Sequence, residues 1–180
     1  MKEPEDYSAE EREFSSEAKR ALNVEKPDRL FARAIKLLAA KSRSESEIRE
    51  RLAEGADANM VDECILRLKE RGWIDDAKFA AGHARHRAGS KGIGRARIAR
   101  ELAVRGVARA AIEQALRAVF EEVNEETLID RAIEKRMRKL TTPLDRNAVK
   151  RLFDHLARLG FERELIINRV RALRVNNKED

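Results

Sequence analysis

Basic side chains gather around one glycine-rich turn in the middle of the chain. The turn reads Lys91-Gly92-Ile93-Gly94 and precedes a helix predicted over residues 95–104. Glycines let a partner approach the backbone closely, and the N-terminus of a helix attracts anions. A site of this kind would bind a phosphate backbone or an acidic protein surface. The candidate contacts are six basic residues: Arg85, Arg87, Lys91, Arg95, Arg97 and Arg100.

The distribution of charge supports this interpretation. The formal net charge is +6, yet residues 76–117 contain ten basic and three acidic residues, a net charge of +7. An uneven distribution of this kind bears on partners rather than on fold. The ordinary alternative is a solvated helix face, and the near-absence of neutralising acids in the segment leaves the two interpretations equally supported. No aromatic residue interleaves with the basic ones, so a platform that stacks single-stranded bases is not indicated.

Other chemistry finds little support. The motif Gly89-x-x-Gly92-x-Gly94 lacks the preceding strand and the downstream acid of a nucleotide-binding fingerprint. Cys64 lies in an apolar stripe, which predicts a buried and inert thiol. His83 and His86 have no third ligand near them in sequence. We therefore predict no catalytic residues, no metal site and no cofactor.

The elements that must position the basic side chains form a repeat. One motif recurs three times with a spacing of about 50 residues, a period typical of helical arrays. It consists of an apolar residue, a Leu four residues later, a Gly about one turn after that, and a second apolar helix. Arrays of this kind offer an extended surface rather than a pocket. The copies are Ile48, Leu52, Gly55, Val61, Ile65; Ile98, Leu102, Gly106, Ile112, Leu116; and Leu152, Leu156, Gly160, Ile166, Val170.

The predicted fold is all-α, with three tandem three-helix repeats, nine helices in total, in an elongated, curved array. The repeats span 28–74, 75–123 and 124–174. They follow a disordered acidic tail over 1–27, of net charge −3, and precede a polar tail over 175–180. We expect a monomer.

Helix boundaries follow from capping residues. Asp28 and Asn59 are predicted to open helices, and Ser44 with Glu47 forms a capping box. Residues 89–94 are predicted to be a loop. Thr142-Pro143-x-Asp145 begins the next-to-last helix, which ends at Gly160.

The junction of the first and second repeats is a structural site. Trp73 is predicted to pack between the two repeats, with a protein-binding role as the alternative. Asp75 and Asp76 are predicted helix caps rather than a catalytic pair. The inter-repeat residues are Trp73, Ile74, Asp75, Asp76 and Phe79.

The composition indicates a cytoplasmic protein. A single cysteine excludes an intramolecular disulfide and fits a reducing compartment. No apolar run approaches the roughly 20 residues that cross a bilayer. The polar, acidic N-terminus differs from a secretory signal.

Two phrases of the sequence resemble the RecX regulatory family, over about residues 30–173. The first runs from Ser44-x-x-Glu47-Ile48 through Leu52 to Leu68-x-x-Arg71-Gly72-Trp73-Ile74-Asp75-Asp76-x-x-Phe79-Ala80. The second runs from Arg87 through Lys91-Gly92-x-Gly94 to Ile98, Glu101-Leu102 and Gly106.

The resemblance implies three tandem three-helix repeats and a protein that binds the RecA recombinase filament in its helical groove. It implies inhibition of filament extension, strand exchange, ATPase and coprotease activity, and hence modulation of homologous recombination, DNA repair and the SOS response. Family members can also bind DNA. The chain departs from the family at Gly82-His83, where a helix-interior Gly costs roughly 1 kcal/mol against Ala.

The alternative function is a stand-alone DNA-binding helical protein. Helix 95–104 would then act as a recognition helix after a short turn, as in helix-turn-helix docking. A specific DNA site and effects that do not require RecA would distinguish this alternative.

Overall fold

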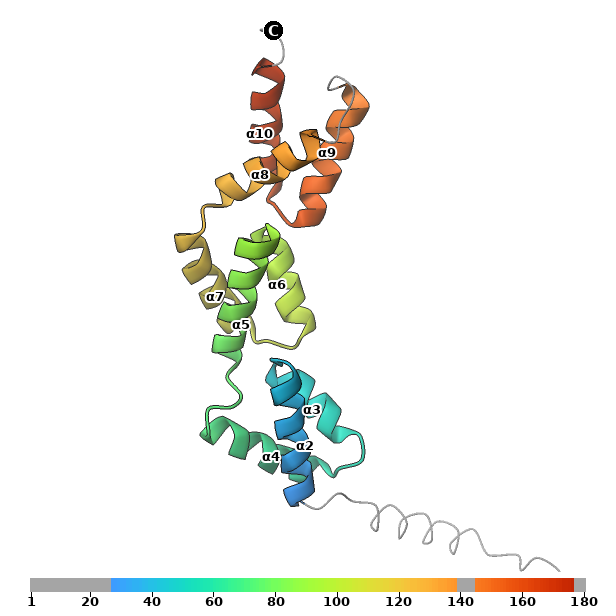
Figure 1. Cartoon of the computed structure of the whole chain (residues 1–180), viewed down its shortest axis with the longest axis vertical. Helices are drawn as coiled ribbons and strands as arrows, with labels where there is room; N and C mark the ends of the chain where they lie inside the picture. The colour runs from blue at the N-terminus through green and yellow to red at the C-terminus, as the bar shows by residue number, and fades with distance from the viewer. Residues whose placement is uncertain (1–26, 139–144, 177–180) are drawn as a thin grey trace, which may run out of the picture. The chain divides into compact units, whose positions relative to one another are not determined.

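The structure, a computed structural model, describes residues 27–138 and 145–176. Within these residues it contains nine α-helices, one π-helical turn and no β-strand (Figure 1). The all-α class and the predicted number of helices are thereby confirmed. The helices form two compact units, the first ending at Ile74 and the second beginning at Asp75. The elongated, curved array and the boundaries of the three repeats stay predictions.

The first unit contains three helices: α2 (Pro27–Ala40), α3 (Glu45–Ala53) and α4 (Ala58–Glu70). Each helix buries residues three or four positions apart, which lie on one helix face. Together they form one apolar core, which consists of Leu30, Ala34, Ile48, Leu52, Val61, Cys64, Ile65, Leu68 and Ile74.

The second unit holds the remaining helices. They are α5 (Asp76–Arg85), the π-helical turn η1 (His86–Ser90), α6 (Arg95–Val104), α7 (Arg109–Glu122), α8 (Glu125–Met137), α9 (Arg146–Leu159) and α10 (Arg163–Asn176). One cluster of buried apolar residues extends from Ala80 in α5 to Val170 in α10. Side chains of α5–α7 and of α8–α10 therefore belong to one continuous core.

The sequence motif that recurs three times is confirmed at every apolar position. All twelve apolar residues of the three copies are at most 8% exposed. The three glycines end the middle helices α3, α6 and α9, and all have positive φ: 98° at Gly55, 74° at Gly106 and 90° at Gly160. Only glycine adopts this conformation without steric cost, which explains why each copy of the motif contains a glycine at this position.

Capping residues set most helix starts as predicted. The Ser44 hydroxyl accepts the Glu47 N–H, and the Glu47 carboxylate accepts the Ser44 N–H, both at 3.1 Å. Asp75 caps α5 by accepting the Lys78 N–H at 2.9 Å. Asp145, predicted as an acid of the first turn behind a cap at Thr142, is itself the N-cap of α9.

Two predicted caps are wrong. Helix α2 begins at Pro27, so Asp28 lies inside its first turn; the fixed φ of proline suits a first helical position. Asp57 rather than Asn59 caps α4, because its carboxylate accepts the Asn59 N–H at 2.9 Å.

The predicted loop over residues 89–94 is wrong in its first half. Helix α5 continues into the π-helical turn η1, and only residues 92–94 are irregular. The turn keeps Ala88 buried in line with Ala80 and Ala84, so the apolar stripe continues past the predicted break. Gly92, with φ of +63°, then ends the helix, and the Ile93 N–H donates to the Arg87 carbonyl at 3.1 Å.

Several predictions lie outside the described residues. They concern the acidic tail before Pro27, the Thr142-Pro143 start signal and the last four residues of the polar tail. Helix α10 extends to Asn176, two residues into the predicted tail. Within the described ranges, no helix is both long and apolar enough to cross a bilayer.

Candidate functional site

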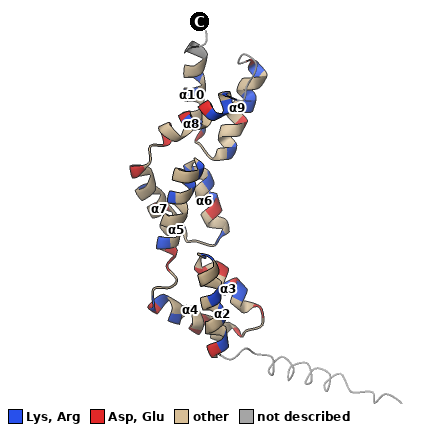
Figure 2. Cartoon of the chain, viewed as in Figure 1, with Lys and Arg blue, Asp and Glu red and all other residues tan. Residues whose placement is uncertain are grey.

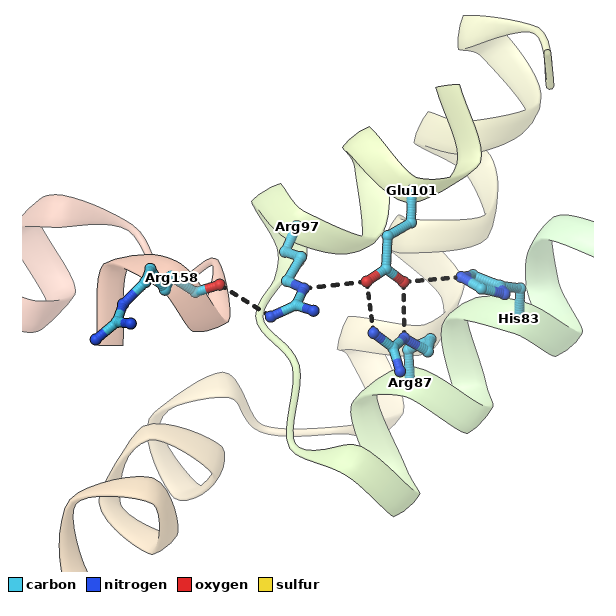
Figure 3. Close-up of polar contacts among 5 residues, drawn as sticks. All are labelled: His83, Arg87, Arg97, Glu101 and Arg158. Carbon is cyan, nitrogen blue, oxygen red and sulfur yellow. Dashed lines mark hydrogen bonds and ion pairs between the residues drawn. The ribbon is translucent and has the colours of Figure 1, made fainter. Parts of the chain in front are cut away.

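Glu101, on α6, lies at the centre of a polar cluster that joins α5, η1 and α6 (Figure 3). Its carboxylate accepts hydrogen bonds from both Nε and Nη2 of Arg87, the first at 2.7 Å. Nε of Arg97 donates to it at 3.0 Å, and Nε2 of His83 lies 3.1 Å from it. A two-point bond from a guanidinium fixes the orientation of a carboxylate, so Glu101 is held in place.

The cluster shifts the pKa of two of its members. Burial by itself would raise the pKa of Glu101, but the hydrogen bonds from Arg87, His83 and Arg97 outweigh it and lower that pKa to about 2. Burial also lowers the pKa of His83, against the opposing hydrogen bond with Glu101. At neutral pH the carboxylate is therefore charged and the imidazole neutral, so Glu101 supplies the only negative charge of the cluster.

A hollow of about 630 Å³ surrounds this carboxylate. Five arginines line it, and one glutamate against five arginines leaves a net charge of +4. The planar guanidinium group binds phosphate and carboxylate oxygens at two points. The hollow can therefore bind an anionic group. Its arginines are Arg87, Arg97, Arg100, Arg105 and Arg158.

Arg158 reaches the hollow because two glycines bring α9 against the start of α6. The Gly94 N–H donates to the Leu159 carbonyl at 2.9 Å, and the Ala96 N–H donates to the Gly160 carbonyl at 3.2 Å. A Cβ on Gly94 would lie 2.5 Å from the Gly160 oxygen, so only glycine fits there. Arg97 also donates to the Arg158 carbonyl at 3.2 Å (Figure 3).

The N-terminus of helix 95–104, which we expect to attract an anion, has three backbone N–H groups with partners inside the chain. Besides the bonds of Gly94 and Ala96, the Arg95 N–H donates to the Glu125 carboxylate at 3.0 Å. A carboxylate of α8 thus occupies the position that an external phosphate would take.

The six predicted basic residues do not line one cavity. Arg87, Arg97 and Arg100 line the hollow around Glu101. Lys91 lines a different cavity, formed with α8 and α9. Arg85 and Arg95 line neither of these two cavities. Basic residues lie on every helix of the second unit rather than on α6 alone (Figure 2).

The expected shortage of neutralising acids is also corrected by the structure. Arg85 lies 3.7 Å from the Glu122 carboxylate, and Nε of Arg95 lies 3.9 Å from that of Glu125. Both glutamates lie outside residues 76–117, so a count over that segment omits them. Arg95 also lies over the ring of Phe120, 4.8 Å from its centroid.

Two arginines of the hollow are absent from the sequence-based set. Arg105 belongs to the segment of net charge +7, so the charge count contained a signal for it. Its guanidinium lies over the ring of Phe79, at 5.4 Å. Arg158 has no such signal, because only the contact between Gly94 and Gly160 brings it near α6.

The predicted inter-repeat residues have contacts within their own units. Trp73 is 48% exposed and stacks on Phe31, with ring centroids 5.8 Å apart. Ile74 is buried in the core of the first unit. In the second unit Asp75 caps α5, Asp76 lies in its first turn, and Phe79 packs against the core. Packing of Trp73 between the repeats stays a prediction.

The buried thiol predicted at Cys64 is confirmed. Cys64 is 4% exposed, and burial raises the pKa of its thiol. No group of three or more His, Cys, Asp or Glu in the described parts of the chain could hold a metal ion.

The family model that matches this chain and three of its relatives carry the name RecX. A family model described as the second three-helix domain of RecX matches residues 75–116. A protein of Xanthomonas axonopodis pv. citri named regulatory protein RecX is 37% identical over 134 residues, which cover 72% of this chain and 78% of that protein. One of the same name from Pelodictyon phaeoclathratiforme is 30% identical over 148 residues, covering 82% and 90%.

One relative is matched over less of its length. The regulatory protein RecX of Treponema pallidum is 36% identical over 107 residues, and the match spans 59% of this chain and 65% of that protein. Among solved structures, RecX from Lactobacillus salivarius superposes with a TM-score of 0.73 at 19% identity, over 83% of this chain and 97% of the other. That likeness concerns the fold.

Proposed function

Because the chain belongs to the RecX family of regulatory proteins, we propose that it binds the RecA filament and inhibits filament extension and strand exchange. In this proposal it also lowers the ATPase and coprotease activities of RecA. It would thereby modulate recombination, DNA repair and the SOS response in the cytoplasm. The protein acts as a monomer and by binding alone, without a catalytic step of its own.

The hollow around Glu101 is the observation that carries this proposal. Its net charge of +4 suits the anions that a nucleoprotein filament presents, which are DNA phosphates and acidic protein surface. Arg100 has no ion-pair partner among the described residues, so its guanidinium is available to an anion. Arg158 adds a charge from α9, so helices from two predicted repeats take part in one contact.

A repeated helical scaffold also suits a filament. Contacts to more than one RecA protomer would multiply weak individual interactions, because the second contact forms at a high effective concentration. Bridging protomers at the growing end would stop extension.

The alternative of a recognition helix has less support. In helix-turn-helix proteins the N-terminal residues of the recognition helix contact base edges. Here the start of α6 contacts α8 and α9, through Arg95 and Gly94, and Arg97 is bonded to Glu101. We therefore propose binding to the filament rather than reading of a DNA sequence by α6.

Co-sedimentation tests the proposal. The full chain is mixed with RecA filaments assembled on single-stranded DNA with a non-hydrolysable ATP analogue, and then with RecA and DNA separately. We expect the chain to sediment with filaments and to lower RecA ATPase activity in a parallel assay with ATP. A chain that stays in the supernatant and leaves the ATPase rate unchanged would show the proposal to be wrong.

A further inference from the structure

A second cavity, of about 340 Å³, lies in the second unit away from Glu101. One side is formed by residues 89–92, at the end of η1, and the others by α8 and α9. Its volume is at the lower end of the range for small-ligand pockets. It is large enough for one inserted side chain and its neighbours.

Among the described residues, four cations line this cavity and no carboxylate does. None of the four has an ion-pair partner within residues 27–138 and 145–176. Unpaired cations gathered at one cavity favour an anionic ligand. They are Lys91, Arg131, Lys135 and Arg136.

The pKa of His155 gives a second indication that the electrostatic potential in this cavity is positive. His155 lines the same cavity. Burial lowers its pKa, and the charges of Arg136 and Arg158 lower it further. A neutral imidazole adds no charge, so the charge of the cavity lining is that of its four cations.

The cavity also has apolar walls, unlike a simple phosphate site. Leu128 is buried at 5% exposure, and Ala132 and Leu159 are partly buried beside it. Burying an aliphatic side chain against such walls stabilises a complex by up to about 1.5–3 kcal/mol. The hollow around Glu101 differs, because Val104 is the one apolar residue among the described residues of its lining.

These properties distinguish between anionic macromolecules. Proteins that bind single-stranded nucleic acid typically combine a basic groove with aromatic rings on which the bases stack. Besides its four cations, two glycines and Ser90, the described lining of the second cavity consists of aliphatic residues and His155, with no Phe, Tyr or Trp. A peptide that alternates carboxylates with an aliphatic side chain satisfies both the cations and the apolar walls.

We propose that the cavity between Lys91 and Lys135 docks an acidic peptide segment of a partner protein, which inserts one aliphatic side chain against Leu128, Ala132 and Leu159. Carboxylates on either side of that side chain would pair with the four cations. The site is separate from the hollow around Glu101, and the proposal does not depend on contact of that hollow with a filament.

The test uses a fluorescein-labelled peptide with one leucine flanked on each side by three acidic residues. Its affinity for the full chain is measured by fluorescence anisotropy, beside that of the same peptide with serine in place of leucine and of a labelled oligothymidylate. We expect the leucine peptide to bind at least about fivefold more tightly than the serine peptide.

Charge reversal locates the site. Lys135→Glu should weaken binding of the leucine peptide at least about tenfold, since a 1.4 kcal/mol loss has that effect. Lys150→Glu makes the same change at an exposed position of α9 that lines neither cavity, and should change affinity less than about twofold. Arg100→Glu alters the other hollow and should also leave peptide binding unchanged, so the two proposals fail separately.

Magnetic resonance gives a readout independent of affinity. The peptide should shift the ring signals of His155 and leave those of His83 in place. Equal binding of the leucine and serine peptides would overturn the proposal. So would loss of oligothymidylate binding in Lys135→Glu with peptide binding intact, because the cavity would then be a nucleic-acid site.

Discussion

Gly160 ends α9 directly against the backbone of Arg97. A Cβ on Gly160 would lie 2.5 Å from the Arg97 nitrogen, and φ of Gly160 is +90°. Both its conformation and its surroundings therefore require glycine. The contact fixes α9 beside α6 and so places Arg158 among the arginines of the hollow. Sequence positions 61 residues apart thus contribute to one cationic surface.

Replacement of this glycine tests the contact. Gly160→Ala should destabilise the second unit by about 1–2 kcal/mol through its left-handed conformation and by a further ~1–3 kcal/mol through overpacking. Gly92→Ala is the matched control, because φ is +63° there and a Cβ added at this position would meet nothing within 4 Å. Urea unfolding followed by circular dichroism measures both, and equal losses would show that the close contact does not matter.

Glu101 predicts a dependence of stability on pH. Its pKa is lowered from 4.5 to about 2, so the folded state binds the proton less readily than the unfolded chain. The stabilisation is complete above about pH 5 and is lost as the pH falls towards 2. We expect a loss of about 1–3 kcal/mol after allowance for the partial exposure of this side chain.

Glu101→Gln should lack that part of the acid dependence. The difference in unfolding free energy between the wild type and the variant should shrink from pH 6 to pH 2. Subtraction removes the contribution of His155 to first order, because Glu101 is not among the groups that shift the pKa of His155. A difference that stays constant over this range would contradict a charged, hydrogen-bonded Glu101.

The capping box of α3 makes a local prediction. Ser44→Ala removes the hydroxyl that accepts the Glu47 N–H, and should destabilise the first unit by about 1 kcal/mol. Ser46→Ala, at an exposed position of the same helix, is the control and should change stability by less than ~0.5 kcal/mol. Thermal unfolding of the two variants gives the comparison, and equal melting temperatures would count against the cap.

The helical scaffold could be predicted because its signals are local. The stripe Ile98 and Leu102 and the glycine at 106 describe one helix and its end, and neighbours in sequence suffice to recognise them. The Ser44 capping box is likewise complete within four residues. These features were confirmed at the level of single side chains.

The site could be predicted only in part, because tertiary contacts decide which cations are available. Arg95 and Arg100 look alike in sequence, yet Glu125 of α8 lies beside the first, whereas the second lines the hollow. The carboxylate of that same glutamate accepts the Arg95 N–H at the N-terminus of α6. Arg158 lines the hollow because the backbone of α9 contacts α6 at Gly160. The pattern of charges along the sequence does not predict this tertiary contact.

Charge reversal in the hollow is the sharpest test of filament binding through its arginines. In the co-sedimentation assay with RecA filaments, the double variant Arg100→Glu/Arg158→Glu is compared with Arg117→Glu/Lys150→Glu, which changes the net charge equally at exposed positions outside both cavities. We predict that the hollow variant binds filaments at least about tenfold more weakly while the control stays within about twofold of the wild type. Equal binding by the two double variants would contradict a filament contact at this hollow.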